Sequence, residues 1–255
     1  MILVNRSIPI LCPLFIFILF EIFFKKPLWI YWLFSLLIVA VAISVWKLIG
    51  RGLITVGARW NFLIAPLFLI TSGLFFILFL ENQILKHFLA IFLAVLLGLF
   101  LENIFIYIYR HDKYQVNSLE NISSYLNLIS TLFFNSGFFG LLIFLNIPVW
   151  LLILLILLVT FSLSYQTMWI NKIVSEKSWI YILIICLILC ELAWALSFLP
   201  TSFYVSGAVL SIAYYLVLGI SRFYLLGNLD AKIVKRHLII SLIVLILILG
   251  TARWV

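Results

Sequence analysis

Long apolar runs separated by short polar segments repeat along the whole chain. A helix needs about 20 predominantly apolar residues to cross the hydrocarbon core of a bilayer. The pattern therefore predicts an all-α fold, a polytopic transmembrane helix bundle with about nine crossings. The runs cover residues 8–24, 28–49, 62–80, 88–109, 124–145, 148–171, 179–199, 203–222 and 237–252.

The first and last runs fit this pattern less well than the others. Pro9 and Pro13 interrupt the first run, and the last is only just long enough to cross. The segments between runs are short, which leaves no room for a soluble domain. We expect residues 1–255 to form a single integral-membrane helical domain.

The composition excludes a water-soluble protein. Hydrophobic residues make up 67% of the chain, charged residues 9%, and the mean hydropathy is +1.34. A soluble domain needs a polar surface to cover its core. The net charge of +8 could indicate binding to nucleic acid. However, the basic residues lie between the runs, where retention of positive charge in the cytoplasm explains them, so no nucleic-acid partner is expected.

The basic residues also predict an orientation, because cytoplasmic loops are enriched in Lys and Arg. With nine crossings and a cytoplasmic N-terminus, 12 of the 16 Lys and Arg residues fall on the cytoplasmic side. The C-terminus is then outside. The 4 basic residues assigned to the outer side are Lys25, Lys26, Lys86 and Arg253.

Two carboxylates within the apolar runs are candidates for function. A charge in the hydrocarbon costs about 2.5–3.5 kcal/mol, so such residues usually face the bundle interior and mark a functional site. Glu191 lies near the middle of the seventh run. Glu102, followed by Asn103, lies in the cytoplasmic half of the fourth run. Both are interpreted as proton or cation sites, with helix packing as the alternative for the pair in the fourth run.

Two structural interpretations accompany the carboxylates. Glu191 could instead stay neutral and hold two helices together through Ser211, Tyr214 or Tyr215 of the eighth run. Glu21, close to the outer end of the first run, is expected to reach the interface and pair with Lys25.

Polar stripes follow one face of each of the fifth and sixth runs. Their members are spaced three or four residues apart, as neighbours on one helix face are. A short turn joins the two runs, so we expect the stripes to meet Glu102 and Asn103 in a polar cluster near the cytoplasm. Hydrogen bonding between helices, at about 0.6 kcal/mol per bond, is the alternative explanation. The stripes are Asn127, Thr131 and Asn135, and Thr160, Ser164 and Thr167.

Enzyme motifs are missing from the sequence. No His is assigned to the interior of an apolar run, so proteolysis by a Ser–His pair lacks its base. Cys186 and Cys190 share a helix face but have no third ligand for a metal site. We therefore predict no catalytic residue, no metal and no cofactor, and interpret the chain as not being an enzyme.

The closing third of the chain carries a resemblance to known sequences. The segments ELAWALSFLP (191–200), YYLVLGISRFYLL (214–226), KRHLIISL (235–242) and the terminal TARWV are similar to uncharacterised multi-pass inner-membrane proteins of small-celled bacteria. The resemblance covers about the last 70 residues. It implies a location in a bacterial inner (plasma) membrane and brings no assigned activity or site residue.

Two functional hypotheses follow. The first is a permease or ion-coupled small-molecule carrier that uses Glu191 and Glu102, with the polar stripes lining a cavity. The second is a non-transporting scaffold, assembly factor or subunit of a larger membrane complex. A lipid-modifying enzyme ranks third. The expected partners are the lipid bilayer and, under the second hypothesis, another membrane protein or a second copy.

Overall fold

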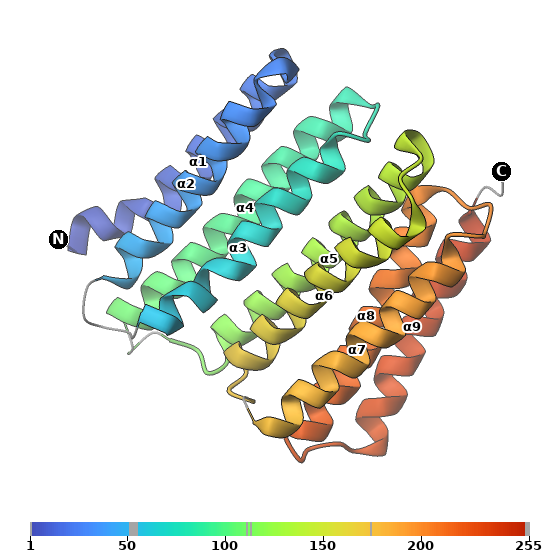
Figure 1. Ribbon diagram of the computed structural model, residues 1–255. Coiled ribbons are helices and arrows are strands. Elements are labelled where there is room, and N and C mark those ends of the chain that lie inside the picture. Colours follow the sequence, from blue (N-terminus) through green and yellow to red (C-terminus); the bar gives the residue numbers. More distant parts are fainter. Residues whose placement is uncertain (1, 51–55, 111, 113, 174, 253–255) are drawn as a thin grey trace. The chain divides into compact units, whose positions relative to one another are not determined.

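The computed structural model describes residues 2–50, 56–110, 112, 114–173 and 175–252. Over these residues the chain forms nine α-helices and one 3-10 turn, Pro27–Trp29 (Figure 1). Each of these nine helices is long and apolar enough to cross a membrane, which confirms the predicted helical bundle. The helices are α1 (Ile2–Lys25), α2 (Ile30–Ile49), α3 (Val56–Ile77), α4 (Gln83–Tyr109), α5 (Ser118–Leu145), α6 (Val149–Ile170), α7 (Glu176–Leu196), α8 (Phe203–Leu225) and α9 (Ala231–Thr251).

Several helices begin before the apolar runs that predicted them. α3 begins at Val56, α5 at Ser118 and α9 at Ala231, each six residues before its run. Polar residues at a helix end lie at the membrane surface and do not raise hydropathy. Their backbone groups still need hydrogen-bond partners, which the extended helix supplies.

The helices group into two compact units, Met1–Asn127 and Leu128–Val255. In the first unit α1 packs against α2 and α4, α3 packs against both of these helices, and α2 and α4 also contact each other (Figure 1). In the second unit α7 packs against both α6 and α8, and α8 also packs against α9. The boundary lies within α5. The single-domain prediction for residues 1–255 stays a prediction.

Proline does not interrupt the first helix. α1 continues through Pro9 and Pro13, which transmembrane helices tolerate when neighbours satisfy the freed backbone groups. Gly98 of α4 faces this stretch: a Cβ added there would lie 3.3 Å from Pro13 Cγ and 3.4 Å from the Pro9 carbonyl oxygen. The small residue thus lets α4 approach the bend-prone part of α1.

A contact between a carboxylate and a histidine joins the ends of α1 and α4 that are predicted to lie outside. Glu21 Oε1 lies 2.7 Å from His87 Nδ1, and the His87 ring packs edge-on against Phe24 at 5.1 Å between centroids. The predicted pairing of Glu21 with Lys25 was therefore wrong. The sequence alone favoured the residue one helical turn away, because the contact with α4 is a tertiary one.

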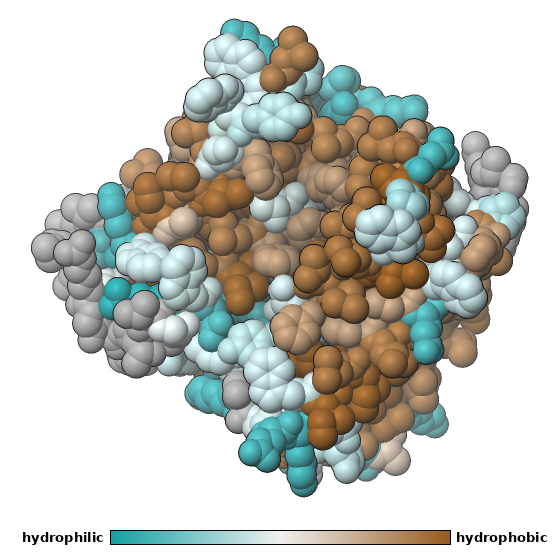
Figure 2. All heavy atoms as spheres, viewed as in Figure 1, coloured by the Kyte–Doolittle hydropathy of each residue, from teal (hydrophilic) through white to brown (hydrophobic). Residues whose placement is uncertain are grey.

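The outer surfaces of the helices are apolar. Figure 2 shows hydrophobic residues over much of the visible face, with hydrophilic residues mostly near helix ends. In α9, Leu242, Ile246 and Leu247 are each about 60% exposed. Such a surface would aggregate in water but matches lipid tails. The chain is an integral membrane protein, and its surroundings are a lipid bilayer.

Candidate functional site

Glu102 lies on an exposed face of α4. Its neighbour Asn103 donates to the carbonyl of Leu99 and accepts a hydrogen bond from Ser118 Oγ, at the first residue of α5. Asn103 is therefore level with the beginning of α5, at the surface end of the bundle. The expectation that Glu102 faces the bundle interior was wrong, because the last turns of α4 extend beside the polar connection to α5.

The polar connection between α4 and α5 is held by Tyr114. Its hydroxyl donates to Glu120 Oε2 at 2.9 Å and accepts from the Leu119 backbone N–H at 3.3 Å. Partial burial, followed by the hydrogen bond to Glu120 and the negative charge of Glu120, raises the pKa of Tyr114 to about 12. The phenol therefore stays a neutral donor at physiological pH.

Glu191 lies on an exposed face of α7, five residues before Leu196, the last residue of the helix. The side chains one turn away on either side, such as Leu187 (58% exposed) and Trp194 (54%), are also exposed and apolar. The expectation that Glu191 faces the interior was wrong. The sequence could not predict which way Glu191 points, because apolar residues surround it on every side of α7.

The two predicted stripes are among the buried polar residues of α5 and α6. All six members are at most 1% exposed, so each stripe faces inward as predicted; they are Asn127, Thr131, Asn135, Thr160, Ser164 and Thr167. Asn127 belongs to the first unit and the other five to the second. Within the second unit the stripes of α5 and α6 converge on α8.

The centre of this convergence is Tyr214, which is 1% exposed. Its hydroxyl lies beside the hydroxyls of Thr131 on α5 and of Ser164 and Thr167 on α6. Asn135 of α5 donates from Nδ2 to Ser211 Oγ of α8 at 3.3 Å. We call these six residues, Thr131, Asn135, Ser164, Thr167, Ser211 and Tyr214, the hydroxyl cluster.

Helices α5 and α8 approach closely next to the hydroxyl cluster. A Cβ added to Gly207 of α8 would lie 2.5 Å from the backbone N and Cα of Ser136 on α5. Real side chains do not approach backbone atoms so closely, so only glycine fits at this position. The contact brings Ser211, one turn further along α8, within reach of Asn135.

The hydroxyl cluster is short of hydrogen bonds. Among the described residues, Asn135 Oδ1, Ser164 Oγ and the Tyr214 hydroxyl are buried without a hydrogen-bond partner. Tyr214 lies near other hydroxyls, but none meets hydrogen-bond geometry with it. Thr167 and Ser211 donate instead to the carbonyls of Leu163 and Gly207. The cluster is thus a neutral set of oxygen atoms suited to hydrogen bonding with water or a small polar solute.

The sequence predicted part of this arrangement. It predicted the inward stripes of α5 and α6 but assigned Glu102 and Asn103 to the same cluster, and offered Tyr214 and Ser211 as partners for Glu191. The pairing of Tyr214 and Ser211 with Glu191 was wrong, because both residues complete the cluster. The membership of Glu102 and Asn103 stays a prediction, because these two residues belong to the first unit. The small-residue spacing of Gly207 and Ser211 was the signal that α8 packs closely on a polar neighbour.

A buried histidine lies in α9, although the sequence analysis assigned no His to the interior of an apolar run. His237 is 5% exposed and donates from Nδ1 to the carbonyl of Ile233. Its ring stacks on Tyr215 at 5.2 Å and meets Phe223 edge-on at 5.6 Å, both on α8. A Cβ on Gly219 would lie 2.7 Å from the ring, so glycine makes room for it. The histidine fixes the register between α8 and α9.

Comparisons with known proteins bear on family rather than on activity. No match was found among curated proteins or among solved structures. One family model, described as a protein of unknown function (DUF5656), matches residues 13–252. The match is far longer than the 70 residues that carried the sequence resemblance. The chain therefore belongs to the uncharacterised DUF5656 family.

Proposed function

We propose that the chain is a non-transporting subunit of a larger membrane assembly, which binds a partner helix through the exposed face of α7 around Glu191. The observation that supports this proposal is the position of that carboxyl group, exposed among apolar side chains of a membrane-spanning helix. The cavities beside α1 and α4 and beside α8 and α9 are lined by apolar side chains and hydroxyls, without a carboxylate. The carboxylate-based carrier is thus less well supported.

The chemistry of Glu191 defines the partner. A carboxylate facing acyl chains is costly, by about 2.5–3.5 kcal/mol at the centre of a membrane helix and less towards its end, and a hydrogen-bond donor or a cation on a neighbouring helix offsets this cost. Leu187, Ile188 and Trp194, exposed around it, provide the apolar contact area that helix packing needs. The partner is a transmembrane helix that presents a Lys, Arg, Asn or Gln side chain at the depth of Glu191.

The basic residues support an orientation for this subunit. Under our proposal the N-terminus lies in the cytoplasm and the C-terminus outside, in a bacterial inner membrane. The 12-to-4 distribution of Lys and Arg supports the orientation, and the resemblance of the closing third supports the bacterial membrane.

Partner binding is tested by substitution and crosslinking in native membranes. We expect Glu191→Leu to reduce co-purification of the partner at least tenfold, and Glu191→Gln to reduce it less, because the amide keeps hydrogen bonding without charge. A photocrosslinking residue in place of Leu187 should give a specific adduct that Glu191→Leu abolishes. The matched control replaces Leu242 of α9, which is similarly exposed on a face without a carboxylate.

Two outcomes would contradict the proposal. Equal adducts at Leu187 and Leu242, unchanged by Glu191→Leu, would show that the α7 face meets only lipid. An adduct of twice the mass of the chain would show that a second copy, rather than a different protein, occupies the face. Retained helix content and elution volume in Glu191→Leu separate lost binding from lost folding.

A permease is the second candidate, and the hydroxyl cluster is the observation that favours it. Three buried polar atoms without partners call for water in the interior of the second unit. If that water belongs to a transport pathway, a cysteine at position 164 should be accessible from water. We expect Ser164→Cys, made in a variant that lacks Cys12, Cys186 and Cys190, to react with a charged thiol reagent when the reagent can reach both faces of the membrane. If the chain is a subunit with a closed interior, this cysteine should not react with the reagent until the protein is denatured.

Two further cysteine variants calibrate this measurement. Ser175→Cys, at an exposed position just before α7, reports full reactivity. Ser162→Cys lies on the same helix as Ser164, but its hydroxyl donates to Leu158 O near the outer surface of α6. Reaction of Ser164→Cys at a rate near that of Ser175→Cys would favour the permease, and a rate like that of Ser162→Cys the subunit.

A further inference from the structure

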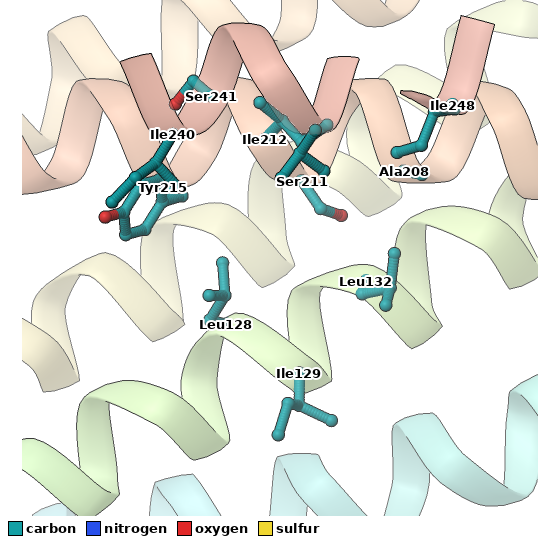
Figure 3. Close-up of a pocket in the computed structure, with 11 residues that line it drawn as sticks. Leu128, Ile129, Leu132, Ala208, Ser211, Ile212, Tyr215, Ile240, Ser241 and Ile248 are labelled. Atoms are coloured by element: carbon teal, nitrogen blue, oxygen red, sulfur yellow. The ribbon is translucent and has the colours of Figure 1, made fainter. Parts of the chain in front are cut away.

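An apolar cavity of about 450 Å³ lies between α5, α8 and α9 in the second unit. Figure 3 shows side chains from the three helices around it, mainly aliphatic. We call it the α5–α8–α9 groove. Its lining residues are Leu128, Ile129 and Leu132; Ala208, Ser211, Ile212 and Tyr215; and Ile240, Ser241, Val244 and Ile248.

The size and the lining of the groove match a hydrocarbon chain. An apolar cavity of about 150 Å³ in a soluble protein stays dry and takes up benzene. The groove is about three times as large and opens at the side of helices that span a bilayer. The molecules surrounding such helices are lipids, and an acyl chain restores the dispersion contacts that an empty groove lacks.

Ser241 provides a polar feature within this apolar wall. Ser241 is 5% exposed and lines the groove. Its hydroxyl has no hydrogen-bond partner among the described residues. A buried hydroxyl without a partner loses the hydrogen bonds that it would make with water, which is unfavourable. A glycerolipid carries ester carbonyl groups close to its acyl chains, and such a carbonyl would accept from Ser241.

Two arginines lie beyond one end of the groove. On α9, Arg236 precedes Ile240, Val244 and Ile248 in a row of residues four apart. On α8, Arg222 lies two turns beyond Tyr215 on the same helix face. The contacts of His237 with Tyr215 and Phe223 bring these ends of α8 and α9 to the same depth.

The spacing along α9 suits a phospholipid. Arg236 and Ser241 are five residues apart, about 7.5 Å along the helix axis. Arginine binds phosphate through paired, charge-assisted hydrogen bonds. Basic residues at the surface end of transmembrane helices are recognition sites for anionic lipid headgroups.

We infer that the α5–α8–α9 groove holds one acyl chain of an anionic phospholipid, whose phosphate is bound by Arg222 and Arg236. The lipid fills the groove, pairs with Ser241 and joins α9 to the rest of the second unit. α9 otherwise buries few of its side chains, His237 and Ser241 among them.

Lipid retention by the purified full-length chain tests the inference. After exchange into detergent and addition of phosphatidylglycerol, we expect about one lipid per chain in the native mass spectrum and a higher melting temperature. Phosphatidylcholine, which has the same acyl chains and no net charge, should be retained at least fivefold less. Inorganic phosphate alone should not raise the melting temperature, because it cannot occupy the groove.

Three variants locate the bound lipid. Arg236→Gln should lower retention at least fivefold, and Ala208→Leu, which extends a side chain into the groove, should do the same. Lys235→Gln removes an equal charge next to Arg236, on an exposed row with Ile239 and Leu242, and should leave retention unchanged. Equal loss in Lys235→Gln would indicate unspecific attraction, and wild-type retention in both Arg236→Gln and Ala208→Leu would overturn the site.

Discussion

Alanine in place of Gly207 is expected to destabilise the second unit by about 1–3 kcal/mol, and leucine by more. The added Cβ would lie 2.5 Å from the Ser136 backbone, which cannot rotate away as a side chain can. α8 would have to move away from α5, and the hydrogen bond from Asn135 to Ser211 would lengthen or break. The hydroxyl cluster would lose its α8 members.

Thermal unfolding of the detergent-purified chain measures this effect. The matched control is Gly250→Ala in α9, where an added Cβ meets nothing within 4 Å. Both substitutions change helix propensity in the same direction, so their difference isolates the clash. Equal melting temperatures for Gly207→Ala and Gly250→Ala would show that α5 and α8 are not in close contact at this point.

Truncation of Tyr214 to alanine should destabilise the chain by about 3 kcal/mol, near the lower limit for a buried aromatic residue. Tyr214 is among the largest fully buried side chains, and its removal leaves a cavity between α5, α6 and α8. We expect a value near the lower limit because helices in a bilayer are surrounded by hydrocarbon whether or not they pack together. Removing the ring therefore costs mainly the packing contacts between helices and little hydrophobic free energy.

Tyr214→Phe separates the ring from its hydroxyl. The hydroxyl is buried without a hydrogen bond, so its removal should leave the melting temperature unchanged or raise it. A loss above about 1 kcal/mol would contradict this expectation and show that the hydroxyl forms a full hydrogen bond, for example to interior water. Both variants are compared with the wild type in the same detergent.

The helices themselves could be predicted from the sequence, because hydrocarbon thickness imposes a minimum length on every crossing. The inward faces of α5 and α6 could also be predicted, since Asn127, Thr131 and Asn135 recur at helical spacing on an otherwise apolar surface. In both cases the pattern of residues along a single helix is sufficient for the prediction.

The partners of those faces could not be predicted. Glu191 has apolar neighbours all around α7, so nothing in its own helix distinguishes an inward from an outward direction. In the sequence, nothing distinguishes Tyr214 from the other aromatic residues of α8. Its buried position depends on the close contact between α8 and α5 at Gly207. His87 pairs with Glu21 across 66 residues of sequence. Each of these relationships depends on packing between helices, which hydropathy does not encode.

Helix α5 belongs to both compact units, since the boundary after Asn127 falls inside its Ser118–Leu145 span. The boundary between the units therefore falls within a continuous helix and not in a connecting segment. Any attempt to produce the halves as separate fragments would sever a continuous backbone ladder and leave amide groups facing hydrocarbon. Fragment complementation should succeed better with a break in the polar segment before Ser118 than with one at the boundary itself.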